Sequence, residues 1–256
     1  MIIFALDNKD RNIKFFIFQP VVSDMNDQKH HLFDCNSCIF KLLTCNFIAE
    51  NEFEILNKSA SQVKFQKGEL ILKQNAKSNN LLFLRKGIVK FIYHYPDGKD
   101  FIMTLVKGPK LLGGANLFFN ETNVFSMVAV EDADICQIDI QAFKTVVKGN
   151  GEFFMAMCEQ AIIMFQSSIF NYISLAHKQV NGRIADILLY LHENVYNDNQ
   201  YEFTLSRKEI SEFAACSHEN VITTLSKFNK EGIIELDKKQ IIIKDIERLS
   251  EISRIG

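Results

Sequence analysis

Residues 205–236 read LSRKEISEFAACSHENVITTLSKFNKEGIIEL, and this stretch decides the interpretation of the chain. Ser206 and Glu209 stand at capping-box spacing, so each satisfies a free amide of a first helical turn and together they predict the start of a helix. After a short break, Ser217 is a natural N-cap for a second helix, which ends near Gly232. The stretch therefore predicts two helices joined by a tight turn.

A small hairpin is predicted directly after the second helix. The apolar runs Ile233–Leu236 and Ile241–Ile243 are separated by a turn at Lys238 and Lys239, and short apolar runs around a polar turn are typical of paired strands. Helix, turn, helix and hairpin in this order predict a winged helix-turn-helix.

The second helix has one apolar stripe and one polar face. Val221, Leu225 and Phe228 recur at helical spacing and are expected in the core. The opposite face then carries side chains that can hydrogen-bond to base edges in a major groove, where the four base pairs differ. The residues expected on that outward face are His218, Glu219, Ile222, Thr223 and Ser226.

Basic residues around this face could neutralise phosphates, which gives an affinity that falls with salt. Residues 178–256 nevertheless hold 11 Lys and Arg against 13 Asp and Glu, so there is no global basic signature, and a protein-docking module is the alternative. The residues predicted to contact DNA are Ser206, Arg207, Lys208, Ser217, His218, Glu219, Thr223, Lys227 and Lys238.

The middle of the chain predicts a β-sandwich or barrel. Turn signals such as Lys86-Gly87 and Pro96-Asp97-Gly98 separate short runs rich in β-branched and aromatic residues. The predicted strands are Leu81–Leu84, Ile88–Tyr93, Phe101–Val106 and Val124–Val130.

Residues Glu152–Ala176 contain no turn residue and predict one long helix. An apolar heptad runs along it, with Met155, Ile162, Ile169 and Ala176 at one position and Cys158, Phe165 and Tyr172 at the other. A helix that is apolar on more than one face must be covered on more than one face. The helix is either buried in a core or packed both on its own sheet and against a twin.

Length and composition place the chain among ordinary globular proteins. It has 256 residues, 47% of them apolar, and a net charge of -2, which alone predicts no partner. No apolar run is long enough for a membrane span or a secretory signal, so we expect a cytoplasmic protein without a membrane partner. Residues 1–34 form an extension without a clear period, and Met25 is an alternative start.

Taken together, these motifs resemble the CRP/FNR superfamily of dimeric bacterial transcription regulators. The similarity runs from about Cys35 to Ile246; it includes Phe65–Glu69 and Leu84–Lys90 as well as the helix-turn-helix residues. The resemblance implies an α+β chain with a jelly-roll effector domain (a double-stranded β-helix), a long dimerisation helix and a C-terminal reader of two-fold symmetric DNA. It also implies RNA polymerase as a further partner. The implied parts are an arm and β-roll at 35–145, the dimer helix at 146–177 and the DNA-binding domain at 178–256.

Two departures from the family pattern limit what can be transferred. In the recognition helix, Thr223 and His218 stand where relatives carry Arg, so the family's usual operator sequence is not assumed. The stretch that resembles the cyclic-nucleotide cassette has Gly114 in place of a Glu, and Leu111–Val130 contains no Lys or Arg. A buried phosphate without a cationic partner is costly, so we predict no cyclic AMP binding.

The cysteines extend the resemblance to oxygen sensors of the FNR type, in which four thiolates hold a [4Fe–4S] cluster. The matching candidates are Cys35, Cys38, Cys45 and Cys136. The gap from Cys38 to Cys45 is one residue longer than in the best-known sensor, which weakens the case for Cys45. Zinc held by Cys35 and Cys38 with His30 or His31, a reversible thiol switch, and an inert arm are the alternatives.

Enzyme function is not expected, because the chain has no nucleophile elbow, Walker loop or dinucleotide-binding loop. A zinc- or thiol-based sensor that acts through protein contacts is the alternative to a DNA-binding regulator.

Overall fold

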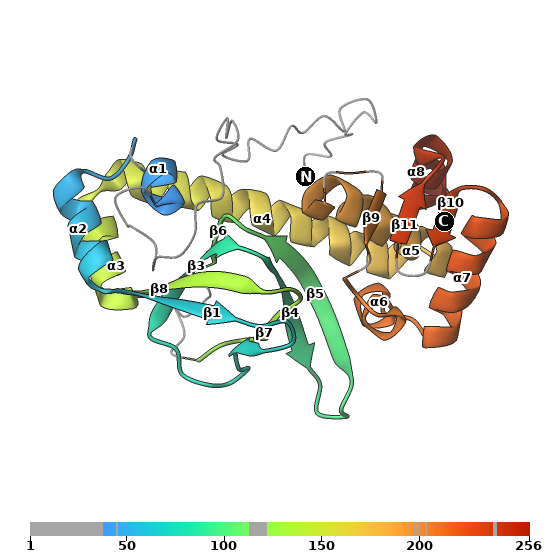
Figure 1. Cartoon of the computed structure of the whole chain (residues 1–256), viewed down its shortest axis with the longest axis horizontal. Helices are drawn as coiled ribbons and strands as arrows, with labels where there is room; N and C mark the ends of the chain where they lie inside the picture. Colours follow the sequence, from blue (N-terminus) through green and yellow to red (C-terminus); the bar gives the residue numbers. More distant parts are fainter. Residues whose placement is uncertain are drawn as a thin grey trace, which may run out of the picture.

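The computed structural model of the chain describes residues 38–44, 46–112, 122–196, 198, 200–202, 204–237 and 240–256. A β-sandwich lies on one side, a long helix runs beside it, and a smaller domain follows at the C-terminal end (Figure 1). The predicted α+β architecture of sandwich, long helix and winged helix-turn-helix is confirmed. The extension at residues 1–34 lies outside the described residues.

The sandwich, which we call the sensor domain after the role predicted from the sequence, consists of two four-stranded antiparallel sheets. Their strand orders are β1-β8-β3-β6 and β2-β7-β4-β5. The strands are β1 (Ala60–Phe65), β2 (Leu70–Leu72), β3 (Asn80–Lys86), β4 (Ile88–His94), β5 (Asp100–Lys107), β6 (Lys110–Leu112), β7 (Ser126–Ala129) and β8 (Ala133–Asp139).

Alternation along the strands builds the sandwich core. Leu82 and Leu84 of β3 and Val89 and Phe91 of β4 pack in one cluster between the two sheets, because successive side chains of a strand point to opposite faces. Gly87 joins these strands at a φ of +102°, and a Cβ there would lie 2.6 Å from the Asp132 carbonyl oxygen. Only glycine fits this turn.

Helices cover the outer face of the β1-β8-β3-β6 sheet. They are α1 (Ile39–Thr44), α2 (Glu50–Lys58) and α3 (Ile140–Gly149). Phe83 and Ile138 of the sheet meet Phe53 of α2 and Phe143 of α3 in a second buried cluster. This cluster fixes the short α1 helix and the residue before it, Cys38, against the sheet.

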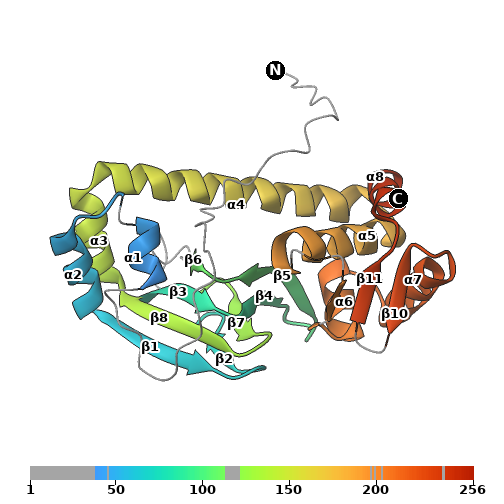
Figure 2. The same cartoon turned by 45° about the horizontal axis from the view of Figure 1, so that its top comes forward.

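The helix predicted at Glu152–Ala176 is present as α4 (Gly151–His177), a long helix of 27 residues. It runs along the sandwich from α3 to the C-terminal domain (Figure 2). The predicted boundary at residue 145 falls inside α3, and α4 itself begins at Gly151.

The C-terminal domain is a helical core with a small antiparallel sheet of order β10-β11-β9. The sequence predicted α5, α6, α7 and the β10-β11 hairpin, whereas it missed β9 and α8. The elements are α5 (Val180–Tyr190), which continues as the π-helical turn η3 (Leu191–Tyr196), β9 (Gln200–Glu202), α6 (Arg207–Ala214), α7 (His218–Lys230), β10 (Ile234–Asp237), β11 (Gln240–Ile243) and α8 (Ile246–Ile255).

All four predicted strands of the sensor domain are present as β3, β4, β5 and β7, with β7 shorter than predicted. Strands β1, β2, β6 and β8 were not predicted individually. Two of these have only three residues, too few for an alternating pattern to be recognised.

Candidate nucleic-acid interface and sensor cavity

The first helix of the helix-turn-helix begins at the predicted capping box. The Ser206 hydroxyl accepts a hydrogen bond from the Glu209 amide at 3.2 Å, and the Glu209 carboxylate accepts one from the Ser206 amide at 2.7 Å. The second helix begins at Ser217, whose hydroxyl accepts from the Asn220 amide at 3.2 Å. Local sequence thus determines where both helices start.

The turn between the two helices is held from outside by Arg183. Ala215 adopts a left-handed conformation with φ of 48°, which is uncommon for a residue with a Cβ. The Arg183 guanidinium donates to the carbonyl oxygens of Ala214 at 3.3 Å and Ala215 at 3.2 Å, and also to that of Lys178 at 2.9 Å. One side chain therefore ties the turn to the end of the long helix.

Helix α7 has the two faces that its sequence predicted. Val221, Leu225 and Phe228 are buried in the core of the domain, and the buried Thr224 hydroxyl donates to the Asn181 side-chain oxygen at 2.9 Å. These contacts fix the rotation of the helix about its axis. The outward residues His218, Glu219, Ile222, Thr223, Ser226, Lys227 and Lys230 are all exposed.

The charges around this face are not equivalent. Hydrogen bonds from its own backbone amide and from Ser217 lower the pKa of Glu219, so this exposed carboxyl is an ionised acceptor at neutral pH. Arg207 is half-buried, and burial lowers its pKa. The Lys208 Nζ atom lies 3.5 Å from Glu212 Oε1 on the same helix, but the Lys208 side chain is mostly exposed. Lys238 lies outside the described residues.

The long helix α4 leaves its heptad stripe uncovered. Phe165 and Tyr172 are 66% and 73% exposed, and Met155, Ile162 and Ile169 are exposed as well. A contiguous line of large apolar side chains on a monomer is typical of a protein interface. The alternative of a helix buried entirely within its own core is therefore wrong.

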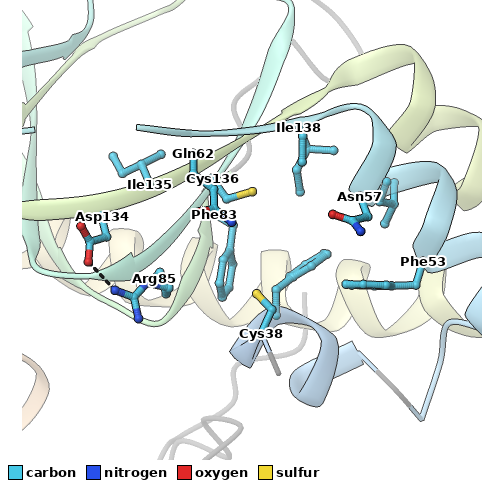
Figure 3. Close-up of a pocket in the computed structure, with 13 residues that line it drawn as sticks. Cys38, Phe53, Asn57, Gln62, Phe83, Arg85, Asp134, Ile135, Cys136 and Ile138 are labelled. Atoms are coloured by element: carbon cyan, nitrogen blue, oxygen red, sulfur yellow. Dashed lines mark hydrogen bonds and ion pairs between the residues drawn. The ribbon is translucent and has the colours of Figure 1, made fainter. Parts of the chain in front are cut away.

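A cavity between α1, α2 and the outer face of the sheet contains two thiols. Cys38 precedes α1, and Cys136 lies in β8 opposite Gln62 of β1 and Phe83 of β3. Both cysteines line this cavity (Figure 3) and are partly buried. Residues 98 positions apart in the sequence are thus brought to one site, whereas Cys35 and Cys45 lie outside the described residues.

Arg85 and Asp134 form an ion pair at the edge of the same cavity. The remaining lining is largely aromatic and aliphatic, including Phe40, Phe53 and Phe83. Among the residues that the structure describes, no group of three or more His, Cys, Asp or Glu is placed to hold a metal ion.

Comparison with known families matches both halves of the chain. Residues 182–252 match the Crp-like helix-turn-helix domain, and residues 62–150 match the cyclic nucleotide-binding domain. The two matches cover the candidate DNA-reading helices and the sensor sandwich in the order expected for one family of regulators.

Individual relatives agree along most of the chain. The cAMP-activated global transcriptional regulator CRP of Pasteurella multocida is 26% identical over 185 residues, which cover 70% of this chain and 88% of that protein. The CRP-like cAMP-activated global transcriptional regulator of Mycobacterium tuberculosis is 23% identical over 203 residues, covering 78% and 91%. The chain belongs to the CRP/FNR superfamily of transcription regulators.

Solved structures of other proteins show the same fold. FixK2 from Bradyrhizobium japonicum superposes with a TM-score of 0.70 at 16% identity, covering 77% of this chain and 98% of that one. A mutant of CooA from Carboxydothermus hydrogenoformans gives 0.66 at 20% identity, covering 85% and 96%. CRP-family members are DNA-binding transcription regulators, not enzymes, and they bind DNA as homodimers.

For this CRP/FNR regulator, sequence reasoning located the two helices of the helix-turn-helix and missed two residues that position them. Arg183 and Asn181 belong to the preceding helix α5, and nothing in their local pattern indicates contact with the turn or with α7. Burial raises the pKa of Cys216, which disfavours the reactive thiolate. No helix in the described ranges is long and apolar enough to span a membrane.

Proposed function

We propose that this regulator binds two-fold symmetric duplex DNA as a homodimer and reads bases with the exposed face of α7. The observation that carries the proposal is the rotation of α7, which buries Val221, Leu225 and Phe228 and leaves His218, Glu219 and Thr223 exposed. Glu219 can accept from a cytosine amino group, and His218 and Thr223 can reach purine edges. Lys227, with Arg207, Lys208 and Lys238, would contact phosphates.

The exposed apolar stripe of α4 supplies the dimer contact in this proposal. Pairing of two copies along Phe165 and Tyr172 would bury side chains that are otherwise left in water. A dimer would present two α7 helices to half-sites about one helical turn, ~34 Å, apart. RNA polymerase is the expected further protein partner.

Selection of duplexes from a randomised pool tests the DNA proposal directly. We expect enrichment of an inverted repeat and binding by the dimeric protein. Recovery of no preferred sequence under aerobic or anaerobic conditions, from a protein that sediments as a monomer, would contradict it.

We further propose that cyclic AMP is not the effector. Ser126, the serine that follows the cassette-like stretch, is buried, and its hydroxyl accepts from the Gln74 amide at 3.0 Å and lies 2.9 Å from His94 Nε2. This hydroxyl is therefore already engaged, and Leu111–Val130 supplies no cation for a phosphate. The residues Gly113–Phe118 lie outside those described. Calorimetry should detect no tight cyclic AMP binding, and tight uptake would overturn this part.

The cysteine pair in the sensor cavity supports a response to oxygen or redox state. Cys38 and Cys136 share one cavity, which suits two corners of a [4Fe–4S] cluster whose other ligands would be Cys35 and Cys45. Such a cluster, when bound, would supply oxygen-sensitive redox chemistry. The residues of this chain would contribute the thiolates and an apolar wall, formed by Phe40, Phe53 and Phe83, that limits solvent access.

Zinc binding or thiol switching at the same cysteines, acting through protein contacts, is the second candidate, because the described residues hold only two thiols at this cavity. Anaerobic purification distinguishes the two. A brown protein that bleaches in air supports the cluster. A colourless protein with stoichiometric zinc, or with a reversible loss of free thiols, supports the alternative.

A further inference from the structure

The C-terminal domain packs directly on the sensor domain through the outer face of β4 and β5. Ile88 and Ile92 of β4 and Leu105 of β5 belong to one buried cluster with Phe213 of α6. Helix α6 lies against β5 in both views (Figures 1 and 2). The first helix of the helix-turn-helix therefore shares a core with the sensor.

A partly buried ion pair crosses this joint between domains. The Lys90 ammonium of β4 bonds to Glu209 Oε1, with the two side chains only 12% and 24% exposed. Lys90 points to the same side of β4 as Ile88 and Ile92, because alternate residues of a strand share a face. Its position on the sheet thus directs its charge at α6.

Glu209 serves both domains at once. Its Oε2 accepts the Ser206 amide at 2.7 Å and completes the capping box, whereas its Oε1 is held by Lys90 of the sensor. Burial by itself raises the pKa of Glu209, but the hydrogen bonds from Lys90 and Ser206 outweigh it, and the pKa lies below its ordinary value. The carboxylate that begins α6 is therefore ionised and bound to a sensor strand.

Among the residues that the structure describes, Lys90 is the sheet cation whose charge acts on both Glu209 and Glu212 of α6. Glu212, one turn along α6, has a raised pKa because of burial, and Asp100 of β5 adds to this rise while Lys208 and Lys90 oppose it. Without a cation between them, repulsion between Glu212 of α6 and Asp100 of β5 would weaken docking of the two domains. Tyr190 adds an uncharged contact, since its hydroxyl donates to the Leu105 carbonyl oxygen at 2.5 Å.

We propose that Lys90 is a positioning residue for DNA recognition: by holding Glu209, it fixes the orientation in which the sensor domain presents the helix-turn-helix to DNA. Removal of one partner would leave the other charge desolvated and unpaired, so the joint would open. A movement of β4 in the sensor domain would shift α6 through the ion pair between Lys90 and Glu209. The DNA readout rests on the proposed function, whereas the opening of the joint can be measured without DNA.

The test compares Lys90→Gln, Glu209→Gln and the double variant in the full-length protein. Gln at position 209 can still complete the capping box, and Lys90→Gln leaves the box intact, so neither variant removes the start of α6. The double variant leaves no unpaired charge and remains informative if a single variant folds poorly. Lys90→Arg, which keeps the charge, should behave as wild type. Lys58→Gln, which breaks the exposed pair with Glu54, is the control.

Two readouts are made on each variant. Hydrogen exchange of α6 and β5 amides should rise together in both single variants and no further in the double variant. Affinity for a duplex selected by the wild-type protein should change more than threefold, in the same direction in all three. Unchanged exchange, an affinity change below threefold, or additive changes in the double variant would overturn the proposal. Failure of the wild type to select any duplex would instead contradict the DNA-binding function and leave the exchange test of the joint in force.

Discussion

Two helices of this molecule leave a face in water, and the faces differ in chemistry. The exposed face of α4 is a line of large apolar side chains that includes Phe165 and Tyr172, whereas the exposed face of α7 carries His218, Glu219 and Thr223. Burial of the first face against another protein gains free energy without any directional bond. The second face gains little from burial but can form specific hydrogen bonds with a polar partner.

Exposure alone therefore does not define a functional surface. The α4 stripe is suited to a second copy of the chain, and the α7 face is suited to hydrated base edges. Because the proposed dimer contact is apolar and the proposed DNA contact is polar and charged, the two should respond differently to mutation and to salt.

The largest effect is expected for Phe165→Glu on α4. A carboxylate at the centre of an apolar contact should weaken dimerisation at least ~100-fold, about 2.7 kcal/mol, and duplex binding should fall with it. Sedimentation at micromolar concentration measures the dimer. The control is Leu70→Glu, which introduces the same carboxylate at an exposed apolar residue of β2 and should remain dimeric. A dimeric Phe165→Glu protein would show that the stripe is not the interface.

Glu219→Ala should change sequence preference without changing the dimer. Loss of an acceptor for a cytosine amino group is worth ~1–3 kcal/mol of discrimination, so we expect about a tenfold smaller preference for the selected sequence over one with that base pair changed. Competition binding measures it. Glu251→Ala, on the exposed side of α8, should leave the preference as in wild type. Equal discrimination by both variants would remove Glu219 from the base-reading set.

A smaller and less specific effect is expected for Lys227→Gln. A lysine that contacts a phosphate should weaken binding to all sequences alike and reduce the slope of log affinity against log salt by about 1. Titration at several salt concentrations checks this, with Lys148→Gln on α3 as the control. Dimerisation through α4 should not weaken with salt. A sequence-dependent loss in Lys227→Gln would assign that residue to base contacts instead.

The smallest effect is expected at the turn that precedes α7. Ala215→Gly should raise the free energy of unfolding by ~0.5–1 kcal/mol, because glycine adopts the left-handed conformation without the Cβ clash. Thermal unfolding of the dimer measures the change. Ala214→Gly, at the last residue of α6, should lower stability instead, because it removes a buried methyl group. If both variants lower stability, the strain at Ala215 is not significant.

Much of the DNA-binding domain could be predicted because its signals are local. The capping box at Ser206 and the N-cap at Ser217 lie within a few residues of the groups that they satisfy. The turn-free stretch Glu152–Ala176 likewise predicted α4 to within one residue at each end. Strand β9 and helix α8 were missed; β9 has only three residues, and its pairing partner β11 lies far along the chain.

The lining of the sensor cavity, by contrast, could be predicted only in part. Resemblance to oxygen sensors grouped Cys38 with Cys136, and the structure places both on one cavity through the pairing of β8 with β1 and β3. No local pattern indicates that Phe53 and Phe83 complete the lining, because they come from a helix and a strand whose packing depends on the whole sandwich.

By itself, the sequence determined where the helices of the helix-turn-helix begin, which face of α7 is polar and which stripe of α4 is apolar. Caps and helical periodicity involve residues within a few positions of one another, so these features are written locally. Only the tertiary structure decided that Arg183 holds the turn, that Cys38 and Cys136 line one cavity with Phe53 and Phe83, and that Lys90 binds the carboxylate of Glu209. Those contacts join residues up to 119 positions apart, and they exist only because buried apolar surfaces bring the elements together.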